Sequence, residues 1–414
     1  MNSCTGTAKF SCRNCNHAGQ WQMADLGTMP PANAYIDSNS LSEERVYPLN
    51  VAVCEQCLLA QVTDVIDPSS IFTQYAYLSS FSKSWLEHAK KYVDEIQGQI
   101  KLDSTSLVIE AASNDGYLLK NFVDLGIPVL GIEPAKNIAA IANEKGIRTL
   151  NCFLNSESGR DIAAEYGKAE LLIGNNVLAH VPDIRSFVSG IKQLLKKDGI
   201  ATFEFPHLLS LIEQSQFDTI YHEHYSYLSL LFLRDMFASL GLKVFDAKRL
   251  STHGGSLRIF VCHDDNHRAV THSLESLQKL ELTFGLDKKQ TYDVFKSNIE
   301  KIKQELLSII QNSKKTGLKI AAYGAAAKGN TLLNYCGITR QDIDFVVDKN
   351  PEKQNKLLPG SHIPIWGEAA LAEYQPDIIL ILPWNLKDEI IEQLAYCKEW
   401  GAQFIVPIPY PELI

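Results

Sequence analysis

The sequence lacks the features that would place the protein in a membrane or on a nucleic acid. No apolar run in its 414 residues approaches the ~18–20 residues that a membrane-spanning helix needs. Its 39 lysines and arginines are outnumbered by 48 aspartates and glutamates, and the net charge of −9 disfavours a polyanion binder. The first residues contain no apolar segment typical of a signal peptide. We therefore expect a cytoplasmic protein without nucleic-acid or membrane partners, of unknown oligomeric state.

Internal repeats are also absent, and the odd number of cysteines, nine, disfavours a disulfide framework. Two CxxC pairs lie near the start, Cys12-Arg-Asn-Cys15 and Cys54-Glu-Gln-Cys57, with 38 residues between them. Together they can complete a tetrahedral shell of four thiolates with no position left for a catalytic water, so we expect structural zinc. The alternative is a redox CxxC, which normally lies at a βα junction and is not paired.

The rest of the chain alternates short apolar runs with helical patterns, which is typical of parallel α/β sheets. The central runs are residues 107–110, 129–133, 171–174 and 200–204. The C-terminal runs are residues 320–323, 345–348, 378–382 and 404–407. A three-and-four spacing predicts a connector helix through Phe295, Ile299, Ile302, Leu306 and Ile309. We predict an α/β protein with a zinc-binding module (residues 1–68), a central Rossmann-like domain (69–275) and a second, smaller Rossmann-like domain (276–414).

The first central run leads into Glu110-Ala-Ala-Ser-Asn-Asp-Gly116. This resembles motif I of class I S-adenosylmethionine (SAM) methyltransferases, in which an acidic residue precedes alternating glycines. Only the last glycine is present here, and Ala112 stands at a frequent glycine position. Glu133 ends the next run, where a carboxylate can accept hydrogen bonds from ribose hydroxyls. An NAD-binding domain is the alternative, but the GxGxxG sequence is absent. We predict SAM contacts from Glu110, Ala112, Ser113, Asn114, Asp115, Gly116, Glu133, Pro134, Asn175 and Asn176.

Two further segments contain candidate acid–base residues. His180 follows the run that ends at Gly174, and polar residues at such strand ends face the ligand crevice of open α/β sheets. Residues 221–227 contain three tyrosines, two histidines and a glutamate, too polar for a core strand and too aromatic for a solvated loop. A histidine there can accept a proton near neutral pH. An HxH metal site is the alternative, although histidines two apart point to opposite faces of a strand.

Two glycine-containing segments later in the chain predict contacts to an anionic group. Residues 253–258 read as a tight turn followed by a strand, with Arg258 available to an anion. Residues 323–330 follow a predicted strand and open a helix, where backbone N–H groups, Lys328 and Asn330 suit a phosphate or a sugar hydroxyl. The P-loop spacing is absent, and the alternative is that these glycines serve only packing.

In this order the segments resemble the SAM-dependent sugar C-methyltransferases of deoxysugar biosynthesis. The resemblance covers essentially the whole chain. It rests on residues 25–33 (DLG…PPAN), 75–80 (YAYLSS), 113–116 (SNDG), 221–224 (YHEH), 254–258 (GGSLR) and 324–329 (GAAAKG).

The resemblance implies methylation at C3 of a nucleotide-linked 4-keto-6-deoxyhexose through an enolate. It implies His224 as the base, with Tyr221 and Glu223 holding or polarising it. It also implies that Tyr75 and His180 position the sugar or stabilise the enolate, and that Arg258, Lys328 and Asn330 hold the substrate. The alternatives are a C5-, O- or N-methyltransferase and an inactive zinc-containing binding protein of the same fold.

Overall fold

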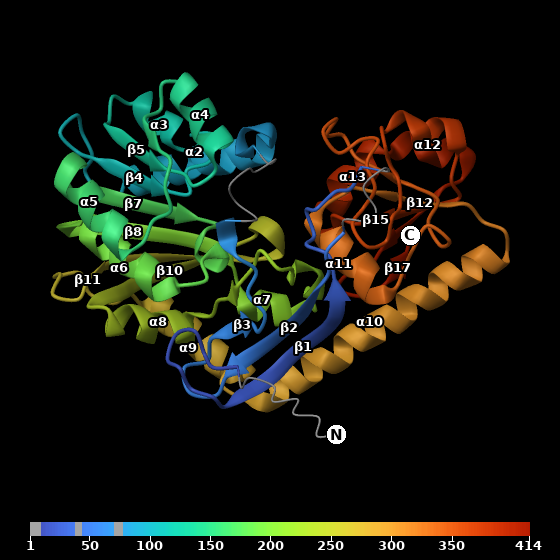
Figure 1. Cartoon of the computed structure of the whole chain (residues 1–414), viewed down its shortest axis with the longest axis horizontal. Helices are drawn as coiled ribbons and strands as arrows, with labels where there is room; N and C mark the ends of the chain where they lie inside the picture. The colour runs from blue at the N-terminus through green and yellow to red at the C-terminus, as the bar shows by residue number, and fades with distance from the viewer. Residues whose placement is uncertain (1–9, 38–43, 70–77) are drawn as a thin grey trace, which may run out of the picture.

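The computed structural model describes residues 10–37, 44–69 and 78–414. Figure 1 shows two α/β domains side by side, with an N-terminal sheet beneath them. That N-terminal sheet is antiparallel and has the order β1-β2-β3-β9. Its strands are β1 (Gln20–Met29), β2 (Tyr47–Cys54), β3 (Ala60–Val62) and β9 (Ser226–Tyr227). The last strand of the sheet in the zinc-binding module is therefore contributed by the central domain.

The central domain contains a seven-stranded sheet of order β10-β11-β8-β7-β4-β5-β6. Its strands are β4 (Val108–Ala111), β5 (Val129–Ile132), β6 (Thr149–Leu150), β7 (Ala169–Asn175), β8 (Leu195–Pro206), β10 (Leu242–Leu250) and β11 (Ser256–His263). The strands from β4 to β8 run parallel, as their apolar runs predicted. Strands β10 and β11 are antiparallel, because the short turn between them permits only a hairpin.

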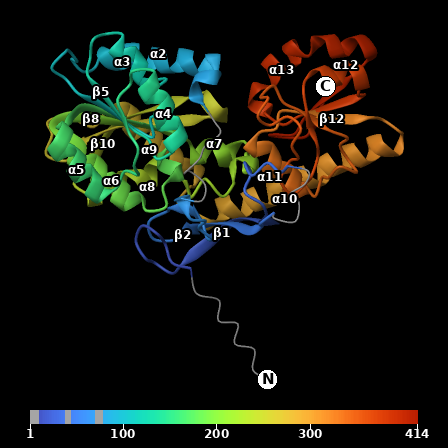
Figure 2. The ribbon, with the colours of Figure 1, turned by 45° about the horizontal axis from the view of Figure 1, so that its top comes forward.

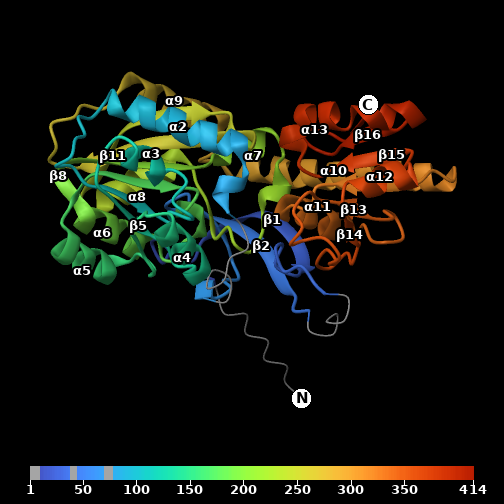
Figure 3. The same cartoon turned by 90° about the horizontal axis from the view of Figure 1, so that it is seen from above.

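Helices cover both faces of this central sheet (Figure 3). Apolar side chains of α2 and α3 pack on one face, and those of α5, α6 and α8 pack on the other. The helices of the domain are α2 (Lys83–Gln97), α3 (Leu119–Val123), α4 (Lys136–Glu144), α5 (Ser156–Tyr166), α6 (Ile184–Leu194), α7 (Leu208–Glu213), α8 (Leu230–Ser239) and α9 (His272–Phe284). Burial on both faces explains why the parallel strands are almost purely apolar.

The C-terminal domain has a six-stranded sheet of order β14-β13-β12-β15-β16-β17. Its strands are β12 (Ile320–Tyr323), β13 (Val346–Val347), β14 (Ile365–Trp366), β15 (Ile378–Ile381), β16 (Gln403–Val406) and β17 (Glu412–Leu413). Its helices are α11 (Ala327–Cys336), α12 (Ala369–Tyr374) and α13 (Lys387–Gln393). This confirms the prediction of a second α/β sheet.

The connector helix α10 (Lys289–Lys315) runs from beneath the central domain to the C-terminal domain (Figure 1). Its buried stripe follows the predicted spacing, except that Ile310 replaces Ile309 as the fully buried residue. One apolar cluster joins α10 to the N-terminal sheet, to α7 and to the C-terminal sheet. Because this core is shared, the three parts hold one another in place. Figure 2 shows the N-terminal sheet lying below both α/β domains. Within the described ranges, every helix is too short or too polar to cross a bilayer.

Candidate functional site

The carboxyl ends of β4, β5 and β7 open into a cavity of about 510 Å³. This is the edge at which ligands bind in open α/β sheets. The residues of our predicted cofactor site that line it are Ala112, Asn114, Glu133, Pro134, Asn175 and Asn176. His180, predicted to have a catalytic role, lines the same cavity. Residues from several sequence motifs of the central domain thus line the same cavity.

The loop after β4 has an unusual backbone. Ala112, Asn114 and Gly116 have φ values of 55°, 49° and 78°, so every second residue of the motif is left-handed. A Cβ atom on Gly116 would lie only 2.4 Å from Ile147 Cδ1, so that position requires glycine. Ala112 occupies a conformation that glycine adopts more easily. The glycine pattern of the motif therefore reflects the backbone path, and alanine at position 112 keeps that path at some conformational cost.

Glu133 connects this loop to the cavity wall. One carboxylate oxygen accepts a hydrogen bond from Asn114 N at 2.9 Å, and the other accepts one from Ala135 N at 2.9 Å. Burial raises the pKa of Glu133 above its ordinary value. Each carboxylate oxygen can accept a second hydrogen bond, so the group can also bind ribose hydroxyls of SAM. The carboxylate, the polar strand ends and the cavity together fit a bound adenosine.

Four other residues of the predicted cofactor set do not line the cavity: Glu110, Ser113, Asp115 and the backbone-constrained Gly116. Glu110 is 1% exposed within β4, and burial raises its pKa well above the ordinary value. Ser113 is fully buried, and Asp115 forms an ion pair with Lys145 at 2.7 Å. These three side chains are buried in the interior of the domain, and a direct contact between them and the cofactor stays a prediction.

The cavity also contains residues that the sequence did not point to. Trp85 on α2 lies against His253, with ring centroids 5.1 Å apart, and both residues line the cavity. The segment 152–155, which follows β6, forms another part of the wall. Trp85 belongs to an amphipathic helix with no local mark of function. Only the path of α2 across the sheet brings it to the site.

Two histidines lie side by side at the edge of the cavity. The ring centroids of His180 and His224 are 4.7 Å apart. His224 Nδ1 lies 2.8 Å from Thr219 O, and His180 Nδ1 lies 2.8 Å from Glu223 O. Because a carbonyl oxygen only accepts, both Nδ1 atoms carry the proton, which makes Nε2 the basic nitrogen of each ring. Burial, reinforced by the neighbouring His180, holds the pKa of His224 well below its ordinary value. Burial lowers that of His180 to about 4.

Of the residues near His224, Tyr221 contacts the His224 ring, whereas Glu223 contacts the N-terminal module. The Tyr221 ring lies against the His224 ring at 4.0 Å between centroids. The Glu223 side chain turns toward the zinc-binding module, where Asn33 Nδ2 donates a hydrogen bond to it at 2.7 Å. Burial raises the pKa of Glu223 to about 7. Tyr75 lies outside the described residues, and its role stays a prediction.

The C-terminal domain reaches the same region through Lys328 on α11. Its Nζ lies 3.4 Å from His253 O and 5.0 Å from the centre of the Trp384 ring. Trp384 Nε1 donates a hydrogen bond of 2.6 Å to Asp218, whose pKa burial raises to about 6. Burial lowers the pKa of Lys328, and its charge in turn helps to lower the pKa of His224. Lys328 is thus a half-buried cation close to the histidine pair.

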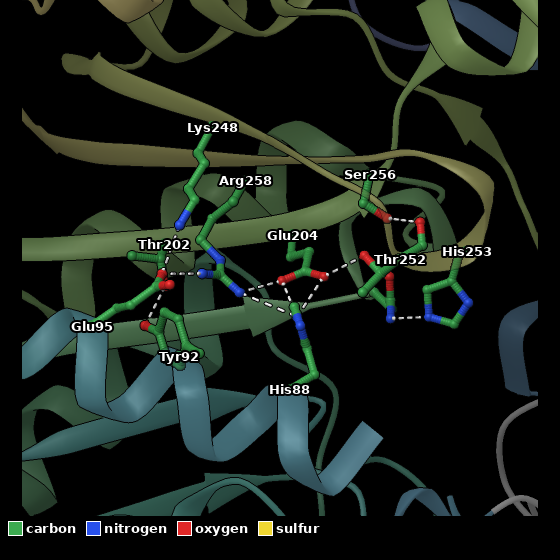
Figure 4. Close-up of polar contacts among 11 residues, drawn as sticks. His88, Tyr92, Glu95, Thr202, Glu204, Lys248, Thr252, His253, Ser256 and Arg258 are labelled. Carbon is green, nitrogen blue, oxygen red and sulfur yellow. Dashed lines mark hydrogen bonds and ion pairs between the residues drawn. The ribbon is translucent and has the colours of Figure 1, made fainter. Parts of the chain in front are cut away.

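The structure disagrees with our expectation for Arg258. This residue is 2% exposed, and its Nη2 donates to Glu204 Oε2 at 2.6 Å (Figure 4). Its guanidinium also lies 4.5 Å from the centre of the Tyr92 ring, and Glu204 also contacts His88 Nε2 at 2.9 Å. An anionic substrate would have to displace a buried carboxylate to reach it. Arg258 is therefore an ion-pair partner inside the domain, because the strand after the predicted turn leads inward.

Asn330 is likewise not positioned as a substrate contact. It is 1% exposed on α11, and its Nδ2 donates to Ala32 O at 2.6 Å. This bond ties the C-terminal domain to the zinc-binding module.

The four cysteines come together as their spacing predicted. One sulfur atom from each of Cys12, Cys15, Cys54 and Cys57 lies within 4.8 Å of the other three. The closest contacts are Cys12–Cys57 and Cys15–Cys54, each 3.5 Å between sulfurs. A tetrahedral zinc ion with Zn–S bonds of about 2.3 Å needs sulfurs at similar separations. The donor set therefore fits a closed structural zinc site.

Comparisons with known proteins match three successive parts of the chain. Residues 12–72 match the family model of a zinc binding domain, residues 85–247 that of a methyltransferase domain, and residues 251–409 that of a C-methyltransferase C-terminal domain. The C-methyltransferase NovU of Streptomyces niveus is 37% identical over 404 residues, which cover 97% of this chain and 96% of that protein. The chain belongs to this C-methyltransferase family.

Solved structures resemble this C-methyltransferase over less than half of its length. Magnesium protoporphyrin IX methyltransferase of Synechocystis, with bound SAM, is 16% identical, covers 43% of this chain and 79% of its own, and gives a TM-score of 0.33. A SAM-dependent methyltransferase of Anabaena variabilis is 14% identical, covers 48% of this chain and all of its own, and also gives 0.33. The family models and the NovU relative, independently of these solved structures, identify the protein as a methyltransferase with a zinc-binding domain.

Proposed function

We propose that this C-methyltransferase adds a methyl group to C3 of a nucleotide-linked 4-keto-6-deoxyhexose. The observation that carries the proposal is His224, whose Nδ1–H is held by Thr219 O so that the basic Nε2 is left for chemistry. The other support is the sequence resemblance to sugar C-methyltransferases described above. Carbon methylation at such a position requires a base, and a histidine that stays neutral at physiological pH can act as one.

The chemistry begins with an acidic carbon. The C4 ketone of the sugar acidifies the C3 proton, and His224 Nε2 removes it to leave an enolate. Burial keeps the His224 ring unprotonated before that step, since its pKa lies well below the ordinary value. Bound SAM would supply the electrophilic methyl group, held by Glu133 and the other residues of the cavity wall. His180 lines that cavity, and its ring also contacts the ring of His224, so His180 connects the cofactor region with the proposed base.

Negative charge develops on the C4 oxygen as the proton leaves. Hydrogen-bond donors aimed at that oxygen would lower the barrier. The Tyr221 hydroxyl is a candidate donor, because its ring is fixed against His224 at 4.0 Å. Lys328 supplies positive charge from the C-terminal domain. We propose that the nucleotide diphosphate lies between the central and C-terminal domains near Lys328, and that Arg258 and Asn330 act structurally.

The decisive experiment offers SAM and a panel of 4-keto sugar nucleotides to the full chain in D₂O. Mass spectrometry and NMR should show one added methyl group on C3 and, without SAM, deuterium at the same carbon. His224→Asn should lower both rates by about 10²–10⁴-fold, the usual contribution of a general base, while SAM affinity stays near normal by calorimetry. His272→Asn is the matched control, because that side chain is 93% exposed. Retained methylation in His224→Asn removes His224 from the base role, and a methyl group on C5 or oxygen overturns the proposed position.

A further inference from the structure

The strand that follows the His224 loop belongs to the sheet of the zinc-binding module. β9 begins two residues after His224, and it pairs with β3 of the module through Gln61–Ser226 and Ala60–Tyr227. Val62 N also donates to Tyr225 O at 3.1 Å. The backbone that follows the proposed base is therefore the edge of a sheet built by the cysteine-rich module.

Arg13 lies inside the first cysteine pair and reaches the central domain. Its Nη1 donates to Pro182 O at 2.8 Å, and its Nη2 donates to Tyr225 O. Pro182 comes two residues after His180, and Tyr225 comes directly after His224. One guanidinium thus bridges the two backbone segments that carry the histidine pair.

The Cys12–Cys15 loop that contains Arg13 is itself held by hydrogen bonds. Arg13 N donates to Gln61 Oε1 at 3.1 Å, and Gln61 is fully buried. Asn14 Oδ1 accepts a hydrogen bond from Arg185 Nη1 at 3.3 Å. The two flanking cysteines belong to the four-cysteine cluster, so bound zinc would set the position of the arginine backbone.

We propose that Arg13 is a positioning residue that sets the spacing and orientation of His180 and His224, with the zinc site as its anchor. The inference rests on the proposed function only in taking His224 as the base. A planar guanidinium can donate to two carbonyl oxygens at once, whereas a lysine ammonium is a point donor on a flexible stem. A displacement of about 1 Å at a reacting group can cost about 10²-fold in rate. The zinc-binding module would then control catalytic geometry as well as stability.

The first test is Arg13→Lys in the full chain, with Arg160→Lys as the control for an arginine-to-lysine change elsewhere in the protein. Arg160 lies on α5, its side chain is 68% exposed and pairs with Asp161 at 3.9 Å, and it belongs to neither histidine segment. We expect Arg13→Lys to lower kcat by about 10- to 100-fold, with KM, SAM affinity and zinc content within about twofold of wild type. Arg160→Lys should leave kcat unchanged. Unchanged kcat in Arg13→Lys overturns the proposal, as does a loss that only follows the fraction of protein still folded and zinc-loaded.

The second test uses the wild-type chain and needs no substrate, so it is independent of the proposed function. Hydrogen–deuterium exchange is measured with zinc bound and after zinc is removed by a chelator. We expect faster exchange in residues 180–185 and 220–227 together with the cysteine-rich segments, because Arg13 loses its anchor. Faster exchange confined to residues 10–62 would overturn the coupling, even if the methyltransferase activity proved to be as proposed.

Discussion

Replacing Glu223 by glutamine should stabilise the protein, and the gain should depend on pH. The Glu223 side chain is buried, and Asn33 Nδ2 donates a hydrogen bond to its carboxylate at 2.7 Å. Burial raises its pKa from the ordinary 4.5 to about 7. Because one pKa unit corresponds to about 1.4 kcal/mol, ionisation of this group costs the folded state about 3 kcal/mol.

The direction in which stability changes with pH follows from proton binding. Between pH 4.5 and 7 the folded chain holds this proton more tightly than the unfolded chain, so wild-type stability falls as the pH rises through that window. The full penalty is present above pH 7. Glutamine retains a carbonyl oxygen for Asn33 and cannot ionise. The variant should therefore gain little at pH 5 and about 3 kcal/mol at pH 8.

Thermal unfolding of the zinc-loaded chain from pH 5 to pH 8 measures this difference. A change of 1 kcal/mol shifts Tm by roughly 2–4 °C in a cooperative unit of 150–250 residues, so the gap at pH 8 should reach several degrees. Glu373→Gln, at an exposed position, controls for the removal of one negative charge. A Tm gap that stays constant across the pH range would refute the reasoning, because it would show that Glu223 does not titrate there.

Four other substitutions or conditions have definite expected outcomes. Cys54→Ser should lower both the zinc content and Tm, as measured by metal analysis and calorimetry, because one of four thiolates is lost. Ala112→Gly should leave stability in urea unchanged or raise it by up to about 1 kcal/mol, whereas glycine normally costs about 0.5–1 kcal/mol; a clear loss would contradict the strain at φ 55°. Arg258→Met should cost about 3–5 kcal/mol in urea unfolding, because the buried Glu204 loses its arginine partner and is left with the weaker contacts to His88 and Thr252. Finally, kcat should persist as the pH falls to 6.5 and decline only below it, since His224 must be neutral to act and its pKa is lowered; a midpoint above 6.5 for this group would count against a buried base.

The parallel parts of the fold could be read from the sequence because their signal is local. The runs at residues 107–110, 320–323 and 378–382 each became a buried strand in a parallel sheet. The hairpin of β10 and β11 and the pairing of β9 with β3 were not predicted. Both depend on partners chosen by the assembled sheet, and a two-residue strand such as β9 has no periodicity to detect.

Some residues of the site could likewise be predicted from the sequence, and others could not. Strand-end residues such as Ala112, Glu133 and Asn175 were predictable because open α/β sheets present that edge to ligands. The burial of Arg258 was not predictable, because it depends on Glu204, a residue on a neighbouring strand more than fifty positions away. Trp85 and His253 were missed for a similar reason, since each reaches the cavity only through the packing of a distant element.

The pairing of β9 with β3 also sets an order of events during synthesis. Gln61 leaves the ribosome about 165 residues before its partner Ser226. At roughly 5–20 residues per second, the edge of the newly made cysteine-rich sheet waits on the order of 10–30 seconds for its last strand. An unpaired sheet edge is an aggregation hazard during that interval. Zinc captured early would keep the nascent module folded while it waits, so metal supply in the cell should affect the yield of the whole enzyme and not only of its first domain.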